Sequence, residues 1–125
     1  MNDNQPIFQQ IMEMIESDII TGVYGTDDLI ISTTQISRVY AVNPTTAVKA
    51  ISKLTDAGVL YKKRGIGMCV APGAREQIMK KRRDVFLNQS IASLIGEAET
   101  LGISLDALIE EINKQGKKQG RSSNK

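Results

Sequence analysis

Two short helices separated by a tight turn are predicted within residues 32–57, and this pattern restricts the fold more than any other feature of the chain. The connection between them is Ala41-Val42-Asn43-Pro44. Asn43 is a favoured N-cap residue, and Pro44 suits the first turn of the helix that follows. The chain is therefore expected to end one helix near residue 40 and to begin another almost at once.

The first of these helices is expected to begin at Ser32 or Thr33, because serine and threonine are both favoured N-cap residues. The helical spacing of its apolar residues directs Ile36 and Val39 inward and Arg38 outward. The segment is short, so it is expected to form only about two turns and to lie against a neighbouring helix.

The second helix has apolar and polar residues on opposite sides and is expected to end near Ala57, before Gly58. The apolar side comprises Ala47, Ala50, Ile51 and Leu54, and the other side comprises Thr45, Thr46, Lys49, Ser52, Lys53 and Asp56. Hydroxyl and ammonium groups on the exposed side of the second helix are typical of a helix-turn-helix, in which that helix enters the major groove of DNA. An ordinary helical hairpin in a small bundle has the same pattern.

A two-stranded ribbon is predicted directly after this helix. Residues 59–64 indicate a basic strand, 65–67 a turn with two glycines, and 68–71 a returning strand. Such a ribbon is either a wing that lies against DNA phosphates or in the minor groove, or a plain hairpin that covers the core. The order of helix, helix-turn-helix and basic ribbon is more specific than any one part, and it favours a winged helix-turn-helix.

Further amphipathic helices are predicted on both sides of this region. Residues 6–21 have apolar residues at helical spacing, with a proline at the start and Gly22 after the end. Residues 74–100 indicate one long helix, and Ser104 suits the N-cap of a last helix beyond Gly102. Residues 114–125 have no apolar side chain to bury, so we expect a disordered basic tail.

The two C-terminal helices combine apolar stripes with acidic outer faces, and such a pair does not enclose a core alone. A second copy of the chain is the favoured partner, because exposed apolar patches usually mark association sites. The alternative is that these helices pack back on the first domain. The predicted dimer interface comprises Leu87, Ile91, Leu94, Ile95, Leu101, Leu105, Leu108, Ile109 and Ile112.

The predicted fold is therefore mainly α with a small β-wing. Residues 1–72 are expected to form a winged helix-turn-helix DNA-binding domain. Residues 73–113 are expected to form a two-helix dimerisation segment, followed by the basic tail 114–125.

Charge is segregated along the chain although the formal net charge is only +2. Residues 32–83 hold eleven basic and two acidic residues, whereas residues 1–31 and 84–113 each hold six acidic residues and no basic one. A basic block between acidic flanks suits a polyanion such as nucleic acid, although a solvated face without a partner has the same composition. No apolar run approaches the roughly 20 residues of a membrane span, and no signal pattern begins the chain, so a cytoplasmic protein is expected without a membrane partner.

Patterns for catalysis and for cofactor binding are missing from the sequence. It has no histidine, no glycine-rich phosphate loop after a strand and no cysteine cluster, so we expect neither an enzyme nor a metal or cofactor site. Cys69 is the single cysteine and is expected to be a small buried apolar side chain rather than a redox switch. The remaining alternative to DNA recognition is a winged helix that contacts protein or RNA without recognising an operator.

The order of elements and several sequence stretches resemble the GntR family of bacterial regulators, and within it the short YtrA-like branch. The resemblance covers residues 6–71 and is strongest at 6–11 (PIFQQI), 42–50 (VNPTTAVKA), 54–60 (LTDAGVL) and 65–70 (GIGMCV). It implies a dimeric DNA-binding repressor on a palindromic operator, with a short C-terminal segment in place of a full effector-binding domain. Any small-molecule effector, whose identity the sequence does not reveal, is expected between the C-terminal helices and the winged domain.

On this hypothesis, double-stranded DNA and a second copy of the chain are the partners. Major-groove contacts are assigned to Thr45, Thr46 and Lys49, with support from Thr34, Arg38 and Asn43. Backbone phosphates are assigned to Lys53, Lys62, Lys63 and Arg64, while Gly65 and Gly67 would let the wing approach closely.

The chain departs from the family at places where relatives have arginine. Thr34 stands near the start of the helix that ends near residue 40, Pro44 begins the helix that ends near Ala57, as in the YtrA-like branch, and Ile66 lies at the wing tip. Lys49 falls where that branch often has a basic residue. Arginine is the side chain that most often grips guanine in a bidentate manner, so direct readout is expected to be weaker or to favour a different sequence.

Overall fold

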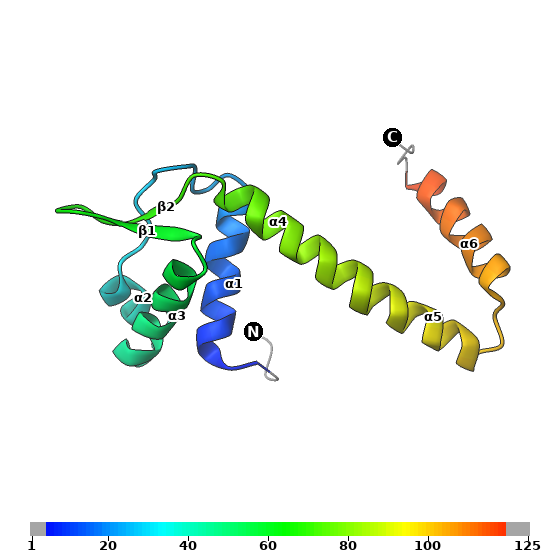
Figure 1. Cartoon of the computed structure of the whole chain (residues 1–125). Coiled ribbons are helices and arrows are strands. Elements are labelled where there is room, and N and C mark those ends of the chain that lie inside the picture. The colour runs from blue at the N-terminus through cyan, green and yellow to red at the C-terminus, as the bar shows by residue number, and fades with distance from the viewer. Residues whose placement is uncertain (1–4, 120–125) are drawn as a thin grey trace. The chain divides into compact units, whose positions relative to one another are not determined.

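The computed structural model describes residues 5–119, which divide into two compact units. The first unit ends at Lys81 and the second begins at Arg82, so the boundary falls inside a helix rather than at the expected position after residue 72. Ala74 and Ile78 belong to the first unit because they are buried in its core. The elements are α1 (Ile7–Ile20), α2 (Thr33–Val39), α3 (Pro44–Asp56), β1 (Leu60–Lys63), β2 (Gly67–Val70), α4 (Ala74–Val85), η1 (Phe86–Ser90), α5 (Ile91–Thr100) and α6 (Leu105–Lys118) (Figure 1).

Helix α1 forms where the apolar spacing predicted it, and Pro6 lies at its N-cap rather than inside its first turn. The carbonyl of Pro6 accepts from the backbone N–H of Gln9 at 3.1 Å. The side chains of Ile11, Ile15 and Ile19 recur at helical spacing and are buried. The helix is followed by Gly22, whose φ of 88° is a conformation that glycine adopts without strain.

The turn between α2 and α3 is built by local hydrogen bonds, as the sequence predicted. Ser32 and Gln35 form a reciprocal capping box at the start of α2, with distances of 3.1 and 3.0 Å. Ala41 adopts a left-handed backbone with φ 53°, which reverses the chain between the helices. Asn43 then caps α3 by accepting from the backbone N–H of Thr45 at 2.9 Å.

Helix α3 is the centre of the first unit and packs against α1, α2 and β1 (Figure 1). Its predicted apolar side is confirmed, because Ala47, Ala50, Ile51 and Leu54 are all buried. The inward orientation predicted for Val39 is wrong, since this side chain is 64% exposed. Val39 is the last residue of a seven-residue helix that buries only Ile36, and the core is closed there by the partly buried Tyr40 and Val42.

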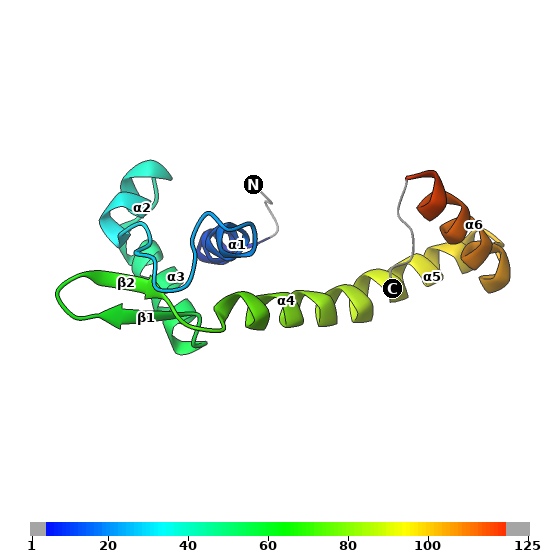
Figure 2. The same ribbon diagram turned by 90° about the horizontal axis from the view of Figure 1, so that it is seen from above.

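Strands β1 and β2 form an antiparallel ribbon in which Leu60 pairs with Val70 and Lys63 with Gly67. Figure 2 shows it as a narrow projection with its turn at the free end. The segment around Leu29 adds only an isolated bridge to Cys69 instead of a third strand. Cys69 itself is buried, which confirms its interpretation as a small apolar side chain.

The second unit contains the end of α4 together with η1, α5 and α6. Ser104 caps α6 by accepting from the N–H of Ala107 at 3.1 Å, and Gly102 has a φ of 75° in the preceding connection. The helix continues to Lys118, five residues past the expected end at 113, and Lys117 and Lys118 in its last turn complement the helix dipole. The expected tail therefore begins helical, and its residues 120–125 lie outside the described residues.

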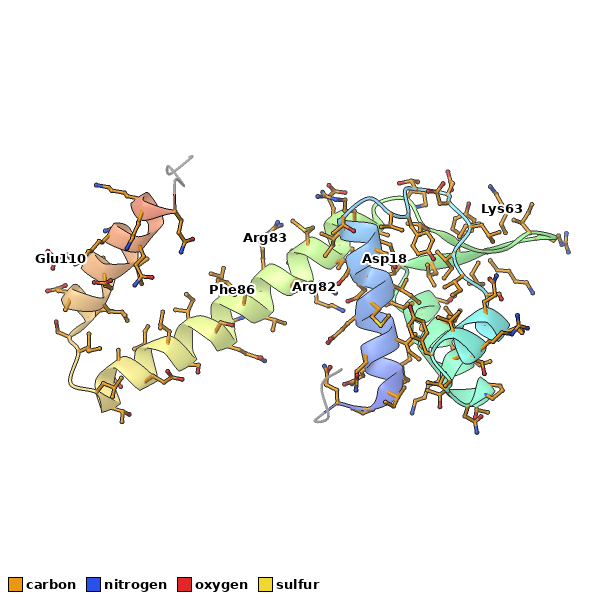
Figure 3. The ribbon with its side chains drawn as sticks, turned by 180° about the vertical axis from the view of Figure 1, so that it is seen from behind. Asp18, Lys63, Arg82, Arg83, Phe86 and Glu110 are labelled. Carbon is orange, nitrogen blue, oxygen red and sulfur yellow. The ribbon has the colours of Figure 1, made fainter. Side chains whose placement is uncertain are left out.

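The second unit buries little of its apolar surface. Among its described residues, Ala98 is the single buried one. Of the predicted interface, Ile91, Ile95 and Leu108 are half-buried. The exposed large apolar side chains are Val85, Phe86, Leu87, Leu94, Leu101, Ile103, Leu105, Ile109 and Ile112, and Figure 3 shows Phe86 on its helix. No helix within residues 5–119 is both long and apolar enough to span a bilayer.

Candidate nucleic-acid interface

One side of α3 faces away from the core of the first unit. Thr45, Lys49 and Ser52 are exposed on this side, opposite the buried Ala50 and Leu54. Thr46, which was assigned to the same face, is half-buried. Of the two threonines at the start of the helix, Thr45 is therefore the more exposed.

Asn43 and Thr45 form a small hydrogen-bonded pair at the N-terminus of α3. Asn43 Oδ1 accepts from both the backbone N–H and the hydroxyl of Thr45, at 2.9 and 2.5 Å. Because the hydroxyl proton is used in this pair, the Thr45 oxygen can serve a further partner only as an acceptor. Asn43 thus combines the assigned interface position with a capping role.

Lys49 is held on one side of α3. Its Nζ lies 4.2 Å from the centroid of the Phe8 ring of α1, which is a cation–π contact. This contact brings α1 next to the exposed face of α3 and gives Lys49 a defined position. Phe8 lies in segment 6–21, which was predicted as an amphipathic helix, and spacing along one helix gives no signal for a contact with another.

A groove of about 270 Å³ runs between α2 and the start of α3. It is lined by Thr33, Thr34, Ser37, Arg38, Pro44 and Val48. The assigned residues Thr34 and Arg38 are exposed here, whereas the Ser37 hydroxyl donates to the carbonyl of Val42 at 2.6 Å and so stabilises the turn. Val48 is 53% exposed in this groove and was not among the predicted site residues.

The ribbon carries Lys62, Lys63 and Arg64 as exposed side chains near its turn, and Figure 3 shows Lys63 there. Gly65 has a φ of 77°. Gly67 has a φ of 140°, and a Cβ at this position would lie 3.0 Å from Leu29 Cδ1. The fold itself therefore favours glycine at position 67, whether or not the ribbon approaches DNA closely.

The base of the ribbon is tied to the loop after α1. The Tyr61 hydroxyl donates to Asp27 Oδ1 at 2.6 Å, and this hydrogen bond is the largest cause that raises the pKa of Tyr61 to about 12. The backbone N–H of Asp27 donates to the carbonyl of Val70 at 2.8 Å. One acidic residue thus contacts both strands of the ribbon.

The basic groups of this face are not neutralised by the protein. Within residues 5–119, no carboxylate forms an ion pair with Arg38, Lys49, Lys53, Lys62, Lys63 or Arg64. By contrast, Lys81 of α4 lies 2.9 Å from the buried Glu16, and Arg75 donates to the carbonyl of Ile20 at 3.0 Å. The positive charge of α2, α3 and the ribbon is therefore available to a polyanion. The same described residues contain no group of three or more potential ligands arranged for a metal ion.

The chain is similar to known transcriptional regulators, although no protein-family model matches it. It is 29% identical over 75 residues to the transcriptional repressor NagR of Bacillus subtilis, a match that spans 60% of this chain and 31% of NagR. A crystal structure of a putative GntR-family transcriptional regulator from Bacteroides thetaiotaomicron is 31% identical, with a TM-score of 0.77 over 90% of this chain and 98% of the other.

Two further structures bear on the interface and the fold. The DNA-binding domain of AraR in complex with operator ORR3 is 31% identical, with a TM-score of 0.52 over 57% of this chain and 86% of that domain. YtrA from Sulfolobus acidocaldarius, a GntR-family transcription factor, covers 94% of both chains with a TM-score of 0.54 and 23% identity, a likeness of fold alone.

Proposed function

The chain belongs to the GntR family of transcriptional regulators, and from this premise we propose that it is a cytoplasmic repressor that binds a palindromic operator as a homodimer. One observation carries the proposal: the exposed face of α3 and the adjoining ribbon carry basic side chains that no carboxylate within residues 5–119 neutralises. Operator DNA is the partner of the similar AraR domain, and NagR is a repressor; both support the proposal.

In the proposed complex, α3 enters the major groove with its N-terminus near the DNA backbone. Thr45 and Lys49 lie toward the base edges, supported by Thr34 and Arg38 from the neighbouring helix. Backbone N–H groups and the helix dipole at the start of α3 favour a phosphate oxygen there. Thr46 is a weaker candidate than Thr45 because it is half-buried.

The phosphate contacts in this complex come from Lys53 at the end of α3 and from Lys62, Lys63 and Arg64 of the ribbon. Gly65 has no side chain to hold its part of the turn away from the sugar-phosphate backbone, whereas the neighbouring Ile66 carries an exposed one. These contacts fix the position of the protein and carry little sequence information, whereas the α3 face supplies sequence preference.

The homodimer in this proposal is formed by the second unit. The described part of this unit buries Ala98 alone, and a second copy of the same surface would cover the exposed apolar side chains. Two copies on one DNA present two α3 helices to two half-sites, which is why a palindromic operator follows from a symmetric dimer.

The first experiment selects duplexes from a random pool and compares the best sequence with a scrambled one by fluorescence anisotropy at several salt concentrations. We expect the selected sequence to bind about 1,000-fold or more tightly than the scrambled one. Equal affinity for all duplexes would contradict operator recognition and would favour a winged helix that contacts protein or RNA.

Removal of a single lysine tests the phosphate contacts. Lys53→Ala and Lys63→Ala should weaken binding to every duplex. Each should flatten the slope of log K against log salt by about 0.9 per lost contact, or about 1.8 for the two copies in a dimer. Lys114→Ala removes the same charge from α6 and serves as the matched control, with an unchanged slope. Unchanged slopes for both interface variants would refute these two contacts.

A further inference from the structure

Val48 is an apolar side chain in an otherwise polar part of the exposed α3 face. It lies one turn after Pro44, is 53% exposed and contributes to the groove between α2 and α3. A single exposed valine is common on protein surfaces and by itself indicates nothing. Val39 on α2 is such a residue, 64% exposed and outside the groove. Val48 differs because it belongs to α3, the helix assigned to the DNA, and lines the groove between α3 and α2.

The groups around Val48 define what the groove can receive. Thr34 and Arg38 are exposed on its α2 side and can donate hydrogen bonds to phosphate or base oxygens. The Ser37 hydroxyl is already used by the carbonyl of Val42. Val48 and Pro44 supply the apolar part of the lining. The groove thus pairs a small apolar surface with polar and cationic groups at one edge.

The major groove of DNA offers one apolar group with which such a surface can pack. The base edges present hydrogen-bond donors and acceptors at every pair, and thymine alone adds a methyl group, at C5. An aliphatic side chain beside hydroxyl and guanidinium groups therefore matches a thymine whose neighbouring phosphate or base is held by those polar groups.

We propose that Val48 is a specificity-determining residue that packs against the 5-methyl group of one thymine in each half-site. The inference rests on the proposed function, because it requires α3 to lie in the major groove of a preferred sequence. Positions 34 and 44 hold threonine and proline instead of arginine, so a thymine contact by Val48 would supply sequence preference that these positions do not.

The experiment removes only the methyl group from the DNA. Each thymine of the selected operator is replaced by deoxyuridine, which keeps the base pair and lacks the 5-methyl group. For the natural protein, we expect one position per half-site at which this replacement weakens binding about fourfold, the loss expected for one buried methyl-sized group. With both half-sites changed, the loss should be about 15-fold if the two are independent.

The protein variants form a double-mutant cycle with the DNA. Val48→Ala should bind the thymine and deoxyuridine forms at that position equally, because the shortened side chain no longer reaches the methyl group. Val39→Ala is the matched control on the neighbouring helix and should keep the full thymine preference. Val48→Thr keeps the branched shape and exchanges one methyl for a hydroxyl, so it should lower the preference even if the alanine variant proves unstable.

The outcomes separate the inference from the proposed function. A selected operator that binds tightly, but at which no deoxyuridine effect depends on residue 48, overturns the inference and leaves the proposed function standing. Failure to recover any preferred duplex overturns the proposed function and the inference with it. A deoxyuridine effect that is lost in both Val48 variants and kept in Val39→Ala supports the thymine contact.

Discussion

At the scale of single residues, Tyr61 and Asp27 join segments that lie 34 positions apart in the sequence. The Asp27 side chain accepts from the Tyr61 hydroxyl of β1, and its backbone N–H donates to Val70 of β2. The carboxylate stabilises the neutral phenol, and this hydrogen bond is the largest cause of the raised pKa of Tyr61. This pair therefore holds the base of the ribbon against the loop after α1.

The pH dependence of this contact has a defined sign. The pKa of Tyr61 is raised in the folded protein from its ordinary value of 10.0 to about 12. A raised pKa means that the contribution to stability is fully present below about pH 10 and is lost as the pH rises through about 12. Burial also raises the pKa of Tyr40, so the test is the difference between variants. We expect a titration of tyrosinate absorbance to show a phenol near pH 12 that is missing in Tyr61→Phe.

Asp27→Asn tests the cause of the shift, because asparagine tolerates the left-handed backbone of this residue, with φ 69°. The late titration should move back toward pH 10. Asp28→Asn is the matched control, since the Asp28 carboxylate accepts from the backbone N–H of Gly25 at 2.7 Å. A transition near pH 12 that persists in Asp27→Asn and disappears in Tyr61→Phe would show that the Asp27 carboxylate is not the cause.

At the scale of elements, Asn43 at the start of α3 has two assigned roles, helix capping and DNA binding. Asn43 caps the helix through the N–H of Thr45, and it was also assigned to the DNA-binding face. A cap contributes about 1 kcal/mol to stability when compared with alanine. A DNA contact by the same side chain would instead change affinity without changing stability, so the two roles can be measured separately.

Substitutions at Asn43 distinguish the two roles. Asn43→Ala should lower the free energy of unfolding by about 1 kcal/mol in a denaturant titration. Asn43→Asp should retain the cap and the stability, because aspartate is an equally good N-cap and its charge suits the helix N-terminus. The same variant should bind DNA more weakly, since it places a negative charge next to phosphates. Equal destabilisation by both variants would refute the capping role.

The elements that could be predicted from the sequence are those with local signals. The Ser32 cap, the Asn43-Pro44 turn and the glycines at 65 and 67 mark helix and ribbon ends, and the structure follows them closely. The π-helical turn η1 was not predicted, because one extra residue in a hydrogen-bonded turn leaves no distinctive residue type. The extension of α6 to Lys118 was missed because polar helix-forming residues resemble a tail.

The candidate site was predictable in composition and less so in geometry. Helical spacing correctly assigned the buried side of α3, but it did not reveal that Lys49 lies over Phe8 or that Val48 lines a groove with α2. Both contacts depend on how neighbouring helices pack, and the spacing of apolar residues along one helix does not reveal that packing. The wrong prediction that Val39 points inward has the same origin. Helical spacing placed Val39 on the apolar side of its helix, but the end of a short helix can extend past the core.

At the scale of the whole molecule, we propose that the second unit determines how many DNA-binding units act together. Helix α6 exposes Leu105, Ile109 and Ile112 along one side, while α5 and α6 enclose only a small apolar cavity of about 110 Å³ between them. Exposed leucine and isoleucine in this arrangement are unfavourable in water. A second copy of the chain would bury them, and we propose this surface as the centre of the dimer.

Ile109→Glu places a charge in the middle of that surface and should convert the protein to a monomer in sedimentation experiments, because an unpaired buried charge is strongly destabilising. Ala107→Glu adds the same charge at an exposed position on the other side of α6 and should leave the dimer intact.

Operator affinity should follow the oligomeric state. A monomer engages one half-site without the effective concentration supplied by its partner, so the loss is expected to be about 100-fold or more, whereas the control should bind normally. A dimeric Ile109→Glu protein with full affinity would move the interface elsewhere. A monomeric variant with full affinity would show that one winged domain suffices, which would contradict the palindromic operator.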